Sequence, residues 1–340
     1  MLKKTIRRLG ALAMVLAMAV SVFAVNASAV EDSSSETEPA TTSNVELDKI
    51  YKNGNENVTN IAPDEEITFS LIDTNPVTVE DSNKYTVDTL PRDIQVKKAQ
   101  GDKKIKVTLP AYANDAIGTF TYTLKEDNMG TAGVTYNTDT ITVVVQRTWV
   151  GTTVSEGVNT TYLIYTGNKE NKAYQFENTY ESGSLTVTKN VTGKLGNKSA
   201  TFHVTVTFTS DKVVRNNITN GSDIVIAPNA WVYNDRTKKY EATTSAFEVT
   251  NGTSIQLDNI PYNVSYSVVE AEADADGYTT TISDNGVGTI ASATKTVTIE
   301  NNKENTAPTG VIMTIAPYAL MVVLAGAFAV VFLSRRNRAE

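Results

Sequence analysis

Six polar residues lie where the alternation of this chain predicts buried side chains, namely Lys49, Glu126, Asn178, Lys189, Glu270 and Asn301. Alternate residues of a β-strand share one face of the sheet, so neighbours of the same parity reveal which way a side chain points. Lys49 shares its parity with Val45 and Leu47, and the other five stand in similar apolar series. Each half of the chain therefore has a lysine, a glutamate and an asparagine directed inward, in that order.

These three residue types can react with one another when they are buried together. Burial lowers the pKa of a lysine and raises the pKa of a glutamate, because it disfavours both charged forms. A neutral lysine amine is a nucleophile, and a protonated glutamate can polarise an asparagine carbonyl and relay protons while ammonia leaves. The product is a Lys–Asn isopeptide bond. The alternative is that each polar residue ends a strand and reaches water, but two matching sets of three favour the reaction.

Strands must position these residues, since period-two alternation in Thr-, Val- and Tyr-rich runs dominates the chain from Val45 onward. Outside the two terminal apolar segments, no stretch has a helical period over three turns. The halves also repeat each other weakly around a turn-rich boundary at residues 178–184. We expect an all-β fold of two immunoglobulin-like β-sandwich domains in series, at residues 45–180 and 184–302.

The amino terminus has the pattern of an export signal. Basic residues including Lys3 and Arg7 precede an apolar stretch at residues 9–25, which the small residues of Ala27-Ser28-Ala29 follow. Residues 1–29 are therefore predicted to be a signal peptide. Residues 30–44 are acidic, rich in Ser and Thr and poor in large apolar side chains, so we expect a disordered leader.

The carboxyl terminus, residues 306–340, combines a short motif with an apolar segment. Residues 311–333 are uncharged and mostly apolar, and arginines follow them, which predicts a transmembrane segment whose end stays in the cytoplasm. Just before it, Pro308-Thr309-Gly310 resembles the sorting signal of Gram-positive surface proteins, in which a sortase cuts between Thr and Gly. Here the proline directly precedes Thr309 instead of lying two places before it. The alternative is an ordinary single-span anchor.

Composition excludes several classes of protein. There is no cysteine and a single histidine, His203, which lies on the polar face of its predicted strand, so a Cys nucleophile, a catalytic triad and a multi-His metal site are not expected. Asp274 and Asp276 are spaced like the start of a calcium loop, but Ser283 stands where that loop needs Glu. We expect a solvated acidic turn there and no cofactor or metal. The net charge of −8 disfavours nucleic acid as a partner.

Taken together, the chain resembles the two-domain backbone pilins of streptococci. The two Lys–Glu–Asn sets carry the resemblance, and so does a stretch that reads Pro308-Thr309-Gly310-Val311, Met313-Thr314 and Ala316-Pro317-Tyr318. The resemblance implies Cna-type domains, each with one self-formed bond, Lys49–Asn178 beside the catalytic Glu126 and Lys189–Asn301 beside the catalytic Glu270. It also implies a displaced proline in the sorting signal.

The resemblance further implies a structural shaft subunit rather than an enzyme acting on other molecules. The precursor would be exported, held transiently in the plasma membrane, and joined through Thr309 to a lysine of the next identical subunit, Lys172 or alternatively Lys169. Expected partners are identical pilin subunits, a pilus sortase, minor pilins and cell-wall peptidoglycan, in a pilus at the cell surface. The alternative function is a sortase-anchored adhesin or minor pilin, at the tip or base, that binds a host ligand.

Overall fold

The computed structural model describes residues 46–151, 156–167 and 175–304. Several predicted features lie outside these residues: the signal peptide at 1–29, the leader at 30–44, the segment at 306–340 with Thr309 and Gly310, and both Lys169 and Lys172. Across the described part of the chain, no helix has the length and apolar character needed to cross a membrane.

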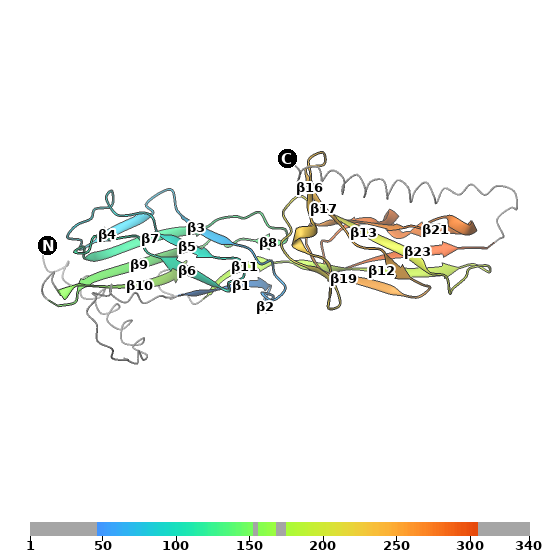
Figure 1. The fold of residues 1–340 in the computed structure, drawn as a ribbon, viewed down its shortest axis with the longest axis horizontal. Helices are drawn as coiled ribbons and strands as arrows, with labels where there is room; N and C mark the ends of the chain where they lie inside the picture. The colour runs from blue at the N-terminus through green and yellow to red at the C-terminus, as the bar shows by residue number, and fades with distance from the viewer. Residues whose placement is uncertain (1–45, 152–155, 168–174, 305–340) are drawn as a thin grey trace, which may run out of the picture. The chain divides into compact units, whose positions relative to one another are not determined.

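The first domain consists of short strands joined by turns, drawn in blue to green in Figure 1. Its strands are β1 (Leu47–Asn53), β2 (Glu56–Asn57), β3 (Ile67–Leu71), β4 (Val77–Glu80), β5 (Gln95–Lys98), β6 (Lys104–Thr108), β7 (Gly118–Glu126), β8 (Val134–Thr135), β9 (Thr140–Trp149), β10 (Val158–Thr166) and β11 (Gln175–Tyr180).

The second domain begins after a single intervening residue, Glu181, and follows in yellow-green to red. Its strands are β12 (Ser182–Thr192), β13 (Phe202–Ser210), β14 (Ile218–Asn220), β15 (Asp223–Ile226), β16 (Val232–Asn234), β17 (Lys239–Thr243), β18 (Phe247–Val249), β19 (Ser254–Pro261), β20 (Ser265–Glu270), β21 (Thr279–Ile282), β22 (Val287–Thr289) and β23 (Thr294–Asn302). Short 3-10 turns are η2 (Pro228–Ala230), η3 (Ala275–Gly277) and η4 (Ser283–Gly286).

The strands of the first domain follow one continuous hydrogen-bonded path rather than two separate sheets. The order is β10-β9-β7-β3-β5-β6-β1-β11-β8, with β2 added to β1 and β4 added to β7. The connection is β6, which pairs on one side with β5, where Val107 faces Val96, and on the other with β1, where Ile105 faces Leu47. The sheet thus folds over its own core.

The second domain has the two separate sheets of a sandwich. One has the order β15-β14-β19-β12-β23-β21, and the other has the order β16-β17-β13-β20-β22 with β18 added to β13. The two sheets enclose their own apolar core, to which Leu185, Val206, Phe208 and Val297 all contribute.

Both cores follow the alternation of the sequence. In β7 the side chains of Phe120, Tyr122 and Leu124 are fully buried, and in β13 those of Val204, Val206 and Phe208 are fully buried. Burying one such apolar side chain stabilises the fold by about 1.5–3 kcal/mol. The inward faces predicted from parity are therefore confirmed for these strands.

The first and last strands of each domain are neighbours and run parallel. In the first domain β1 pairs with β11, and in the second β12 pairs with β23. Two adjacent parallel strands must be joined by a long segment of chain, and here that segment is the rest of the domain. The two ends of each domain's chain thus lie side by side in one sheet.

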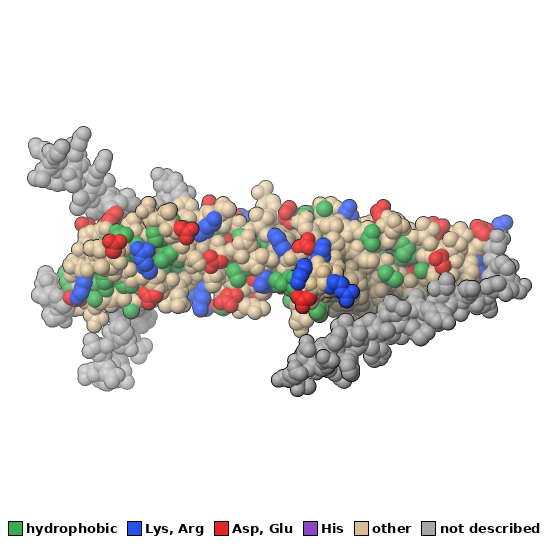
Figure 2. All heavy atoms as spheres, turned by 90° about the horizontal axis from the view of Figure 1, so that it is seen from above, with side chains coloured by type: hydrophobic (Ala, Val, Ile, Leu, Met, Phe, Trp, Pro, Cys, Tyr) green, Lys and Arg blue, Asp and Glu red, His purple; other side chains and the backbone are tan. Residues whose placement is uncertain are grey.

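The surface is polar and mixed in charge. On the face that Figure 2 shows, lysine and arginine side chains and aspartate and glutamate side chains are both scattered among uncharged residues. Surface ion pairs such as Lys52–Glu177 and Lys106–Asp102 contribute to this mixture.

Candidate functional site

The register of the parallel strands places each lysine near an asparagine. Lys49 is opposite Phe176 on β11, and Asn178 is opposite Tyr51 on β1. In the second domain, Lys189 is opposite Ile299 on β23, and Asn301 is opposite Val191 on β12. In both domains, therefore, the asparagine is opposite the residue that lies two positions after the lysine. Because that spacing keeps parity, lysine and asparagine point to the same face of the sheet.

The glutamates come from other strands, across the core. Glu126 is the last residue of β7, where it is opposite Phe69 of β3, and Glu270 is the last residue of β20, where it is opposite Val204 of β13. In the second domain, β20 belongs to the sheet that faces β12 and β23. Each glutamate thus reaches a lysine and an asparagine that neighbouring strands hold together.

In the first domain, one carboxylate oxygen meets both partners. The Lys49 Nζ atom lies 2.9 Å from Glu126 Oε1, and the Asn178 Nδ2 group donates a hydrogen bond of 2.9 Å to the same oxygen. The main-chain N–H of Asn137 donates to the Asn178 side-chain carbonyl at 3.0 Å. This N–H points at the oxygen on which negative charge would develop if the carbonyl carbon were attacked.

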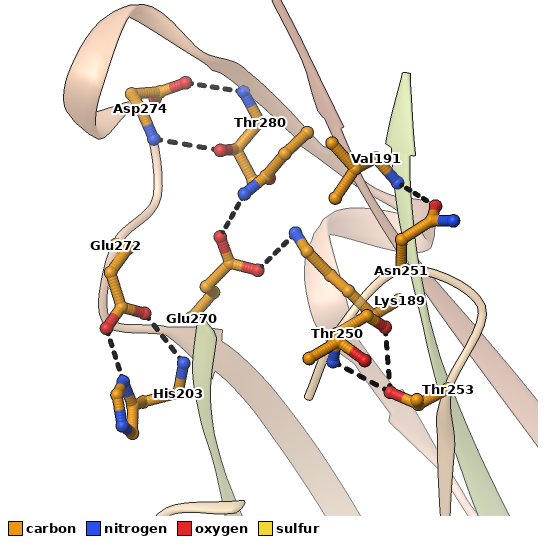
Figure 3. Close-up of polar contacts among 11 residues, drawn as sticks. Lys189, Val191, His203, Thr250, Asn251, Thr253, Glu270, Glu272, Asp274 and Thr280 are labelled. Carbon is orange, nitrogen blue, oxygen red and sulfur yellow. Dashed lines mark hydrogen bonds and ion pairs between the residues drawn. The ribbon is translucent and has the colours of Figure 1, made fainter. Parts of the chain in front are cut away.

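In the second domain, Glu270 uses both oxygens. Lys189 Nζ donates to Oε2 at 2.6 Å, and Asn301 Nδ2 donates to Oε1 at 2.6 Å. Figure 3 shows the Lys189 side chain extended toward the Glu270 carboxylate. Among the described residues the buried Asn301 Oδ1 atom has no hydrogen-bond partner. The two domains therefore build the same three residue types into slightly different arrangements.

An aromatic ring lies under each amine. Lys49 Nζ is 4.6 Å from the centre of the Phe176 ring, and Lys189 Nζ is 4.2 Å from the centre of the Phe202 ring. A ring face attracts a cation and fills space around the aliphatic stem. The rings hold the amines beside the glutamates and exclude water from them.

Burial sets the protonation of these groups. Each of the six side chains belongs to a residue no more than 5 % exposed. Burial lowers the pKa of Lys49 to about 8, against the opposing pull of Glu126, and it also lowers the pKa of Lys189. Burial likewise raises the pKa of Glu126, against the pull of Lys49. Both shifts in the first domain favour moving the proton from lysine to glutamate.

The arrangement suits an amide exchange between side chains. A neutral lysine amine would attack the asparagine carbonyl carbon, and the glutamate would carry the amine's proton to the departing nitrogen. The C–N bond to the side-chain nitrogen breaks, a new C–N bond to lysine forms, and ammonia leaves, so atoms and charge balance. Neither a cofactor nor a metal enters these steps.

Phe202 provides a test of the packing around the second set. The test uses an Asn301→Ala background, in which the Lys189–Asn301 bond cannot form. There, Phe202→Ala is expected to lower the free energy of unfolding of the second domain by about 3–5 kcal/mol, because it leaves a cavity beside Lys189. Urea denaturation measures this. The exposed Val232→Ala change in the same background should stay within about 0.5 kcal/mol. A loss below about 1 kcal/mol for Phe202→Ala would contradict the packing role.

The other polar candidates lie apart from these six residues. His203 is partly exposed and its Nδ1 atom lies 2.6 Å from Glu272 Oε1. Asp274 closes its own turn, since its side chain accepts from the Thr280 N–H at 2.7 Å (Figure 3). In the described ranges, no group of three or more His, Cys, Asp or Glu side chains is arranged to hold a metal ion.

Sequence reasoning did not identify three neighbours of the reacting groups. The Asn137 N–H is a main-chain group in a turn-rich stretch, which no residue pattern marks. Phe176 and Phe202 have the inward parity of their strands, but nothing in the sequence shows that their rings face the lysines. The pairing of β1 with β11 places Phe176 beside Lys49, whereas Phe202 reaches Lys189 across the core from the opposite sheet.

Comparison with known proteins shows what each domain is similar to. Residues 45–181 match the family model described as the Spy0128-like isopeptide containing domain. Lys49, Glu126 and Asn178 all lie within the matched range. Residues 183–303, which hold the second set, match a family described as a domain of unknown function.

Proteins similar to a larger part of the chain include streptococcal pilins. The chain is 29 % identical over 244 residues to a pilin of Streptococcus pyogenes serotype M1, covering 65 % of this chain and 68 % of that protein. It is also similar to a solved structure of the major pilin from Streptococcus pyogenes, at 22 % identity and a TM-score of 0.48, covering 79 % of this chain and all of that one. Another similar structure is a major pilin protein, T3.2, of the same species, at 23 % identity and a TM-score of 0.45, covering 77 % and 98 %.

Proposed function

We propose that this protein is a structural shaft subunit of a sortase-assembled cell-surface pilus, held together by one self-formed Lys–Asn isopeptide bond in each domain. The observation that carries the proposal is the repeated Lys–Glu–Asn arrangement, buried at the same register between the first and last strands of each domain. The bonds are Lys49–Asn178, formed with Glu126, and Lys189–Asn301, formed with Glu270. The 29 % identity to a streptococcal pilin supports this function.

The position of the bonds suits a fibre under tension. Force applied to the two ends of a domain enters through β1 and β11, or through β12 and β23. Parallel strands pulled from opposite ends would otherwise separate by breaking their hydrogen bonds. A covalent tie between the two strands carries the load past the domain core, which then need not unfold.

Assembly uses residues outside the described part of the chain. The exported precursor is held in the membrane by residues 311–333 until a pilus sortase cuts between Thr309 and Gly310. The Thr309 carbonyl then passes to a lysine of the next identical subunit, and we favour Lys172 over Lys169. Minor pilins and cell-wall peptidoglycan are the remaining partners of the finished fibre.

Polymer formation in cells tests the assembly step. Lys172→Ala, with Lys169 intact, is expected to abolish the ladder of high-mass covalent polymer seen by denaturing gel electrophoresis, because the acceptor amine is gone. Lys169→Ala is the matched control and should leave the ladder unchanged. Unchanged ladders in Lys172→Ala cells would refute this acceptor.

Immunogold labelling separates a shaft subunit from an adhesin. Antibodies to this chain should label fibres along their whole length. Labelling confined to a fibre tip or base would instead indicate the alternative function, a minor pilin or adhesin that binds a host ligand.

A further inference from the structure

A second buried carboxylate lies beside the reacting groups of the first domain. Glu65 is 1 % exposed. Its Oε1 atom accepts from the Tyr51 hydroxyl at 2.7 Å, and its Oε2 atom accepts from the Thr131 hydroxyl at 2.5 Å and from the Tyr136 hydroxyl at 2.7 Å. Three hydroxyl donors can stabilise a carboxylate charge that has been removed from water.

Tyr51 connects this carboxylate to the reacting lysine. It lies two residues after Lys49 on β1, shares its face, and is the residue opposite Asn178. The Lys49 Nζ atom is 5.6 Å from the centre of the Tyr51 ring, whose hydroxyl contacts Glu65. In the second domain the equivalent position is Val191, which cannot hold a carboxylate in this way. Glu65 is therefore a feature of the first set only.

We propose that Glu65 is a positioning residue for the Lys49–Asn178 reaction, and that its charge keeps the single mobile proton of the Lys49–Glu126 pair within the site. The inference rests on the proposed isopeptide function. The reaction needs one proton shared by the pair, because it begins with a neutral amine and a protonated carboxyl. A site that loses this proton has no acid for the departing ammonia, and a site that gains another has no nucleophile.

The sign of the effect follows from electrostatics. A nearby negative charge disfavours further loss of a proton, and Glu65 raises the pKa of both Lys49 and Glu126. With Glu65 ionised, the pair loses its mobile proton at a higher pH and also accepts a second proton at a higher pH. Removing the charge should thus move both limbs of the pH–rate profile to lower pH, without a change in mechanism.

The other charged and titratable groups around this cluster remain constant in the test. Tyr136 faces Glu65 directly, and Arg215 Nη1 donates to the Thr131 hydroxyl. The positive charge of Lys98 lowers the pKa of Lys49, opposite to the effect of Glu65. The Lys98 amine donates to Asp64 Oδ1 at 3.0 Å and to the Glu65 main-chain oxygen at 2.9 Å. A change confined to the Glu65 side chain leaves these groups in place.

The experiment measures the rate of bond formation in each domain against pH. The full chain is recovered from inclusion bodies in urea, its intact mass is checked to show that no ammonia has been lost, and it is then diluted into detergent-containing buffers over a range of pH. Peptide mapping by mass spectrometry then follows the Lys49–Asn178 and Lys189–Asn301 crosslinks separately. Glu65→Gln is expected to move the profile of the first bond down by about one pH unit, a tenfold change in proton affinity. The second bond should be unaffected.

Three further variants make the result specific. Glu66→Gln removes an exposed neighbouring carboxylate and should leave the profile in place. Glu65→Asp keeps the charge and should hold the profile at its original pH, even where its rate is lower. Glu65→Met introduces a second uncharged side chain of similar length and should show the same shift. It replaces Glu65→Gln in the test if that variant folds poorly. The fold of each variant is checked by near-ultraviolet circular dichroism in an Asn178→Ala background.

Two outcomes would overturn the inference, and they differ from failure of the proposed function. If uncharged variants slow the first bond equally at every pH, or leave it unchanged, Glu65 is only structural. If the parent chain never forms the Lys49–Asn178 bond while remaining folded, the proposed function itself fails, whatever Glu65 does.

Discussion

A chain that carries both Glu126→Ala and Glu270→Ala is expected to keep the mass of its unreacted polypeptide, whereas the folded parent chain is expected to lose two molecules of ammonia. Neither lysine then has a partner that can take its proton and deliver it to the departing nitrogen. General acid–base catalysis of this kind contributes about 10²–10⁴-fold to a rate. Intact-mass spectrometry of the purified exported region measures the difference directly.

Single variants assign each ammonia to its domain. Glu126→Ala should leave one bond, Lys189–Asn301, and Glu270→Ala should leave the other. Glu177→Ala is the matched control, because Glu177 adjoins Asn178 on β11 but is partly exposed and paired with Lys52. An unreduced mass for the folded parent chain would refute self-formed bonds.

A separate set of variants tests why ammonia is retained. It distinguishes a missing catalytic group from a failure of the chain to fold. Removing Glu126 leaves Lys49 buried without its partner, which costs about 3–5 kcal/mol. Asn178→Ala and Asn301→Ala remove the electrophile and retain the Lys–Glu pair. Circular dichroism should show these chains folded, and their mass should also remain that of the unreacted polypeptide.

The second large effect is mechanical. Pulled from its two ends, the Asn178→Ala chain is expected to lengthen by on the order of 400 Å when the first domain unfolds, because more than one hundred residues between Lys49 and position 178 become extensible at about 3.5 Å each. The parent chain should show no such step, since the Lys49–Asn178 bond bypasses those residues. Single-molecule force spectroscopy resolves lengths of this size.

Matched variants again provide the comparison. Asn301→Ala should produce a corresponding step from the second domain, and Asn159→Ala, an exposed asparagine on β10, should produce none. A parent chain that extends by the same length as Asn178→Ala would show that the first domain is not crosslinked. The bond should also stabilise each domain at equilibrium by about 4–5 kcal/mol, as estimated by the loop-entropy model for crosslinks.

The sequence predicted the all-β fold and the direction of the six polar side chains because strand parity is a local property. Lys49 and Asn178 each stand in a clear apolar alternation, so their shared burial follows without knowledge of the topology. Their parallel pairing does not follow from local pattern. The resemblance to pilins implied that Lys49 and Asn178 are joined, but not that β1 and β11 run parallel.

Other parts of the structure depend on distant segments meeting. The expected pair of separate sheets is found in the second domain, but in the first domain β6 connects strands into one path, and no local pattern specifies two partners for one strand. Glu65 stands in the acidic run Asp64-Glu65-Glu66, where the sequence gives no sign that its middle member is buried. The Asn137 N–H is equally invisible, since every residue other than proline has one.

Only Glu181 separates β11 from β12, so the route from one crosslink to the next is short. With both bonds formed, a continuous covalent path runs from Lys49 directly to Asn178, along the backbone to Lys189, and directly on to Asn301. More than two hundred residues lie in the two bypassed loops. A protease that cut the backbone once within either loop would leave the subunit a single molecule, so the fibre would tolerate damage that severs an ordinary chain.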